Sequence, residues 1–96
     1  MLYMMQGKAL EVKSLQACIL YDPDDGSVAH RHEVVNFADA IKTDAEVQAD
    51  AYRLASQLGL DVTRLKALIP PAGTYSSQKA YKVDVKSQEL VEVPHA

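Results

Sequence analysis

The sequence predicts an α+β fold: a mostly antiparallel sheet of four to five strands, made of two β-hairpins plus a strand, with one amphipathic helix packed on one face. Three observations support it: a turn sequence between strand-like segments at residues 15–37, a capped helical pattern at 44–58, and a second strand pair at 79–93. The 96 residues fit a single domain, 1–96, with 1–8 as a frayed extension and 94–96 as a tail.

The first hairpin is marked by its turn. The apolar segment 15–21 is followed by Asp22, Pro23, two further aspartates and Gly26, and the chain then returns as a segment rich in valine and histidine. Pro23 presets φ for a turn corner, and Gly26 can take the left-handed conformation that closes the loop. This pattern predicts a hairpin with a four-residue loop.

The register of this hairpin decides which side chains share a face of the sheet. If Asp22 lies opposite Ser27, the facing pairs are Tyr21–Val28, Ile19–His30, Ala17–His32 and Leu15–Val34. This face is the more apolar one, so we place it toward the helix. The other face then carries an apolar strip of Cys18, Leu20, Ala29 and Val35. A slip of one residue would exchange the two faces.

The helix is predicted from about Asp44 to Leu58. Thr43 and Glu46 are spaced as a capping box, and Gly59 is placed as a left-handed C-terminal cap. An apolar stripe recurs at helical spacing, formed by Val47, Ala51, Leu54, Ala55 and Leu58.

Two elements complete the fold. Residues 64–69 alternate apolar and polar side chains and favour a strand, with a short helix as the alternative; Pro70 and Pro71 end either form. Residues 79–93 read as a second hairpin around a turn without glycine or proline.

Composition excludes several function classes. Ten basic and thirteen acidic residues give a formal charge of −3 without a basic patch, so we expect no nucleic-acid partner. No apolar run has the length of a membrane span, so we expect no membrane partner. The lone Cys18 favours a reducing compartment, and we expect a soluble cytoplasmic protein. No catalytic or cofactor-binding motif is present, so we expect no cofactor and do not favour an enzyme.

His30 and His32 are the main candidates for a binding site. Two residues apart on a strand, their imidazoles point to the same side, with Cβ atoms about 7 Å apart. They could bind a metal or small ligand, with Tyr21 as the third group on the same face. The alternative is two strand histidines that only pack and hydrogen-bond. Cys18 could act as a nucleophile opposite Arg31, or be a small core or interface residue.

A single helix cannot cover both faces of such a sheet. The strip of Cys18, Leu20, Ala29 and Val35 therefore suggests an interface, and a two-fold homodimer is the assembly we expect. The function predicted on this basis is a small non-enzymatic interaction module that binds a protein or small ligand. The alternative is a metal- or small-molecule-binding protein that uses His30 and His32.

The segment from Tyr21 to His32, with the pattern Y-D-P-x-x-G-x-V-x-H-x-H, resembles the opening hairpin of a loose group of short bacterial proteins. In that group a helix, an arginine-leucine turn and a closing hairpin follow, as residues 55–65 and 81–93 do in type here. The resemblance implies the same order of elements. It brings no established activity, so it implies no functional residues.

Overall fold

The computed structural model describes residues 2–5, 8–11, 14–36 and 42–94. The elements in chain order are β1 (Leu2–Met5), β2 (Lys8–Glu11), β3 (Ser14–Tyr21), β4 (Val28–Asn36), α1 (Asp44–Gln57), the 3-10 helix η1 (Val62–Arg64), β5 (Lys66–Leu68), β6 (Ala80–Asp84) and β7 (Glu89–Val93). All strand pairs in the described ranges are antiparallel, in the sheets β1–β2, β4–β3–β5 and β6–β7.

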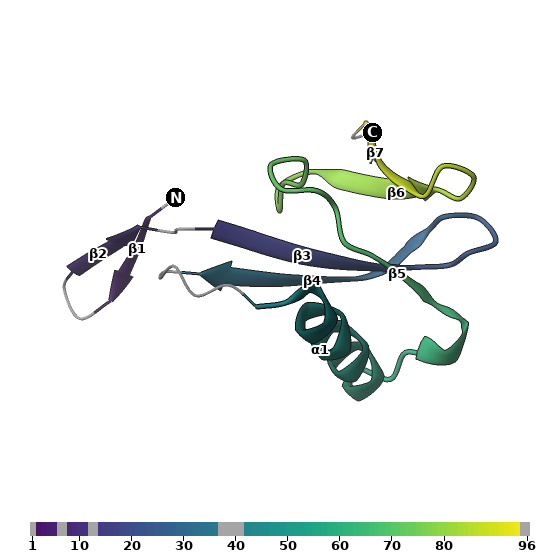
Figure 1. The fold of residues 1–96 in the computed structure, drawn as a ribbon, viewed down its shortest axis with the longest axis horizontal. Coiled ribbons are helices and arrows are strands. Elements are labelled where there is room, and N and C mark those ends of the chain that lie inside the picture. The colour runs from purple at the N-terminus through teal and green to yellow at the C-terminus, as the bar shows by residue number, and fades with distance from the viewer. Residues whose placement is uncertain (1, 6–7, 12–13, 37–41, 95–96) are drawn as a thin grey trace.

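The α+β class, both hairpins, the single helix and the strand at 66–68 are confirmed. The single sheet of four to five strands is wrong, because the five strands from Ser14 onward form two sheets, of three and two strands. The physical reason is the pair Pro70 and Pro71, which lack the N–H groups needed to continue β5 along β3. The chain turns away after β5, and β6–β7 folds over the sheet instead (Figure 1).

Both faces of the three-stranded sheet are covered, as Figure 1 shows, by α1 below and β6–β7 above. On the α1 side, Cys18 and Leu20 are fully buried with the helix residues Val47, Ala51 and Ala55. On the other side, Ile19 and Tyr21 pack against Val83 of β6. β3 is therefore the central strand of the core, and its residues 17–21 are all buried.

A β-bulge in the first hairpin corrects the predicted register. Tyr21 lies opposite Val28 as expected, but Leu20 pairs with His30, so Ala29 is an extra residue on β4. Every earlier pair is displaced by one, and Cys18 faces His32 while Ile19 faces Arg31. The predicted faces of β3 are exchanged: Cys18 and Leu20 face the helix, and Ile19 and Tyr21 face the second sheet.

The helix forms as its local signals predict. Thr43 accepts from the Glu46 N–H at 3.2 Å while the Glu46 carboxylate accepts from Thr43 N–H, which completes the capping box. At the other end Gly59 has φ 89°, and the Leu60 N–H donates to the Ala55 carbonyl at 3.1 Å, as in a Schellman motif. Leu58 is the exception to the predicted stripe, because its side chain is 70% exposed.

Gly26 joins the two hairpins. Its carbonyl accepts from Val83 N–H at 2.8 Å, and its φ is 78°. A Cβ atom at this position would overlap the Val83 carbonyl oxygen. Glycine is therefore required here by the close approach of the β3–β4 turn to β6 as well as by the turn itself.

The structure describes part of each chain end. At the N-terminal end, which includes the predicted extension 1–8, strands β1 and β2 pair from Leu2 opposite Glu11 to Met5 opposite Lys8. The prediction of a frayed extension stays a prediction. Of the predicted tail 94–96, residues 95–96 lie outside the described residues.

Candidate functional site

His30 and His32 share one face of β4, as predicted, but not with Tyr21. Directly opposed residues lie on the same face, so the pairs with Leu20 and Cys18 place both imidazoles on the α1 side of the sheet. Tyr21 belongs to the cluster on the opposite face. The predicted ligand set of His30, His32 and Tyr21 is therefore divided between two faces.

The surroundings of His32 disfavour its charged form. Burial lowers the pKa of this imidazole, Asp50 raises it, and the neighbouring His30, Lys42 and Arg53 side chains lower it further. The Nε2 atoms of His30 and His32 are covered and have no hydrogen-bond partner among the described residues. The lowered pKa of His32 favours its neutral imidazole on the α1 side of the sheet.

A zinc-type centre would need further ligands beside the two histidines. Among the described residues, no group of three histidine, cysteine, aspartate or glutamate side chains is arranged to hold a metal ion. Cys18 lies opposite His32 rather than opposite Arg31, so the predicted separation of Cys18 from the histidines is wrong. Burial raises the pKa of the Cys18 thiol to about 11, which leaves almost no nucleophilic thiolate at neutral pH.

The four residues predicted as an interface strip do not lie together on an open face. Cys18 and Leu20 are fully buried beneath α1. Ala29 is exposed at the bulge, and Val35 is half-buried on β4. The sheet face that was expected to be uncovered is covered within the chain, so the reason given for a homodimer through that face is absent.

Arg31 forms a clamp that nothing in the sequence marks. Its Nε donates to the Tyr75 hydroxyl at 2.8 Å, and its two terminal nitrogens donate to the carbonyls of Lys79 at 2.8 Å and Ser76 at 3.0 Å. The Tyr75 hydroxyl in turn donates to Glu33 at 2.7 Å. The partners are more than 40 residues away in the chain, so only the tertiary fold brings them together.

Residues 14–17 of β3 have an unpaired backbone edge among the described residues, as does the outer edge of β4. β4 pairs with β3 along residues 14–21, but β5 pairs only with residues 19–21 on the other edge. Among the described residues, no backbone group joins residues 14–17 on that edge. If β5 continued in register, Pro70 and Pro71 would face Ala17 and Gln16, and neither proline has an N–H to donate.

A cavity of about 230 Å³ lies along this open edge. Residues 14–17 of β3 form one wall, and residues 69–73 form another. Asp44 and Val47, from the first turn of α1, and Tyr75 complete the lining. The cavity is therefore bounded by a strand edge, a helix start and the segment held by Arg31.

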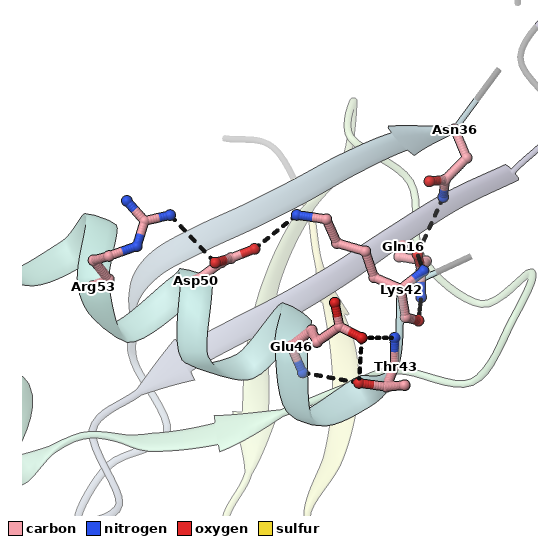
Figure 2. Close-up of polar contacts among 7 residues, drawn as sticks. All are labelled: Gln16, Asn36, Lys42, Thr43, Glu46, Asp50 and Arg53. Carbon is pink, nitrogen blue, oxygen red and sulfur yellow. Dashed lines mark hydrogen bonds and ion pairs between the residues drawn. The ribbon is translucent and has the colours of Figure 1, made fainter. Parts of the chain in front are cut away.

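Polar contacts fix the wall that β3 and the helix start share (Figure 2). The Gln16 side-chain amide donates to the Lys42 carbonyl at 2.8 Å and accepts from Asn36 at 3.1 Å. The Lys42 ammonium points along the helix to Asp50, at 2.8 Å, which also accepts from Arg53 at 3.2 Å. These hydrogen bonds hold the pKa of Asp50 below its usual range. The positive charge of Lys42 is therefore directed away from the cavity.

A second cavity, of about 410 Å³, lies on the β7 side of the same connecting segment. It shares Ile69 and Pro71 with the first cavity, and Leu68, Leu90 and Glu89 are among its other walls. Gln88 also lines it, with φ 58°. The connection between β5 and β6 thus lines both hollows, each of which has apolar residues and one acidic residue in its walls.

Comparison of the chain with protein-family models, curated proteins and solved structures gives no match. The resemblance to short bacterial proteins therefore stays a prediction. No helix in the described ranges is long and apolar enough to cross a membrane.

Proposed function

We propose that this protein is a small non-enzymatic interaction module that binds an extended segment of a partner protein by adding it as a strand to β3. The observation that carries the proposal is the unpaired edge of β3 at residues 14–17, which lies along a cavity. Backbone N–H and C=O groups on such an edge are a template for a further strand.

The dimensions favour an extended peptide over a compact small molecule. An added strand beside residues 14–17 would cover about 13 Å at roughly 3.3 Å per residue. Pockets for drug-sized ligands usually hold about 300–1,000 Å³, so the 230 Å³ cavity suits one or two side chains of that strand. Each main-chain hydrogen bond contributes about 0.5–1.5 kcal/mol, so we expect modest affinity with specificity from the cavity.

Side chains flank the open edge of β3 on both faces of the sheet, and this supports selective binding. Asp44 and Val47 stand on the α1 side, whereas Tyr75 stands on the side of the second sheet. Because side chains of a strand alternate between its faces, an added strand would place successive side chains against these two walls. Neither of these two cavities is lined by residues of β4, whose outer edge is also unpaired.

The proposal is tested by selecting a random octapeptide library against the full-length protein. The blocking variant is Ala72→Trp, because Ala72 is exposed and lines the cavity. The matched control is Ala49→Trp, on the exposed side of α1 and outside both cavities. We expect enriched peptides that bind the wild type and Ala49→Trp equally but lose at least tenfold in affinity for Ala72→Trp. Absence of enrichment, or equal binding to Ala72→Trp, would contradict strand addition at this edge.

A further inference from the structure

We infer that the segment added to β3 is basic as well as apolar, with a lysine or arginine placed beside Asp44. This inference rests on the proposed function and specifies the chemistry of its partner. It is carried by the distribution of charge around the open edge.

The cavity beside β3 has one charged lining residue among the described residues, Asp44. No described lysine or arginine side chain forms an ion pair with this carboxylate. Lys42, two residues earlier, has its ammonium 2.8 Å from Asp50 instead, as Figure 2 shows. Asp44 is also exposed, so its carboxylate is available to a cation from outside the chain.

The second cavity has the same sign of charge. Glu89 is its one charged lining residue among the described residues, and its remaining walls are apolar or neutral. The whole chain has a formal charge of −3. An acidic segment beside β3 would meet like charge at Asp44, whereas a basic one would meet opposite charge.

The walls also define where the apolar side chains of the segment lie. On the α1 side, Val47 is 1% exposed and Ile69 packs against the same core, so a side chain entering there meets apolar atoms. Asp44 is exposed in the first turn, one helical turn before Val47. An apolar side chain against Val47 and a basic one reaching Asp44 therefore fit the same added strand.

The exposure of Asp44 limits how much an ion pair with the added segment can contribute to binding. Asp44 is in contact with solvent and stands at the positive end of the helix dipole, so the pair is worth about as much as other exposed ion pairs, roughly 0.2–1 kcal/mol. That range corresponds to a preference of up to about fivefold in the dissociation constant. The preference must shrink in high salt, because exposed pairs are screened.

The test uses blocked octapeptides that alternate valine and threonine, with each threonine replaced in turn by lysine, glutamine or glutamate. Their dissociation constants are measured by fluorescence anisotropy with the wild type, with Asp44→Lys and with Asp44→Asn. Glu92→Lys is the matched control, because it makes the same change in net charge at an exposed position of β7 outside both cavities. Thermal melts check that each variant is folded.

For at least one of the replaced threonine positions, we expect the wild type to bind the lysine peptide about two- to fivefold more tightly than the glutamine peptide. Asp44→Asn should abolish this preference, Asp44→Lys should transfer it to the glutamate peptide, and Glu92→Lys should leave it in place. The charge inference is overturned if the three peptides bind with equal affinity, or if Asp44→Lys leaves the order of their affinities unchanged. Strand addition still stands in that case if peptide binding protects the amides of residues 14–17 from exchange. Failure of every peptide to bind overturns strand addition as well.

Discussion

The guanidinium of Arg31 lies over the ring of Tyr75, 5.0 Å from its centroid, while the Arg31 Nε donates to the Tyr75 hydroxyl at 2.8 Å. The same guanidinium binds two carbonyls of the segment that follows Tyr75. Arg31 therefore fixes this segment to β4 and positions Tyr75 as a wall of the cavity beside β3. The stability of the fold and the shape of the proposed binding edge depend on the same side chain.

We expect Arg31→Ala to lower the free energy of unfolding by about 2–3 kcal/mol, because partly buried hydrogen bonds to a charged group are lost together. Arg31→Lys should lose roughly 1–2 kcal/mol, because lysine lacks the planar fork. Urea denaturation measures both values. Arg53→Ala is the control, since Arg53 makes one exposed ion pair at 3.2 Å and should lose less than about 0.5 kcal/mol. Equal losses for Arg31→Ala and Arg53→Ala would contradict the clamp.

Gly26→Ala tests the close approach of the first hairpin to β6. We expect it to lower the free energy of unfolding by about 3 kcal/mol, from backbone strain at φ 78° and from overlap with Val83. Gly73→Ala is the matched control, because Gly73 has φ 81° but no atom within 4 Å of the added Cβ. It should lose only about 1 kcal/mol. Equivalent chemical-denaturation curves for the two variants would show that the contact with Val83 is unimportant.

Gln88 stands at φ 58° in the β6–β7 turn, a conformation that favours glycine. We expect Gln88→Gly to raise the free energy of unfolding by about 0.5–1 kcal/mol, because relief of strain outweighs the entropy gained by the unfolded chain. Ser87→Gly changes the preceding turn position, which has no positive φ, and should not raise the free energy of unfolding. Thermal melts distinguish the two. A lower melting temperature for Gln88→Gly than for the wild type would refute the expectation.

The lowered pKa of His32 predicts that the protein loses stability in mild acid. Its pKa is lowered in the folded state, chiefly by burial, from an ordinary value of 6.5. The unfolded chain therefore binds more protons below that pH, and the free energy of unfolding falls as pH drops below about 6.5. His32→Gln should flatten this slope between roughly pH 6.5 and 5, before carboxylates titrate. Denaturant midpoints measured across this range check it, and an unchanged slope in the variant would exclude His32 as its source.

The local elements were predictable because their signals are local. Thr43, Glu46 and Gly59 mark the ends of α1 within a few residues of sequence, and Gly26 marks the turn of the first hairpin. Alternation of apolar and polar side chains predicts the strand at 66–68, and Pro70 follows its end closely.

The register was not predictable from the same signals. An extra residue at Ala29 leaves the turn chemistry unchanged yet exchanges the faces of β3, because the side-chain period of a strand is two. The cover over Ile19 and Tyr21 depends on Val83, more than 60 residues later. The candidate site was missed for a similar reason, since an unpaired edge is visible only when the length of β5 is compared with that of β3.

The most direct test of strand addition is amide hydrogen exchange along β3, measured by NMR for the full-length protein with and without the tightest lysine octapeptide. In the free protein, we predict that amides of residues 14–17 that point away from β4 exchange faster than those of residues 19–21, which β5 covers. Saturating peptide should slow these amides at least roughly tenfold. Unchanged exchange at residues 14–17 while the peptide is bound, or protection confined to other strands, would contradict strand addition at β3.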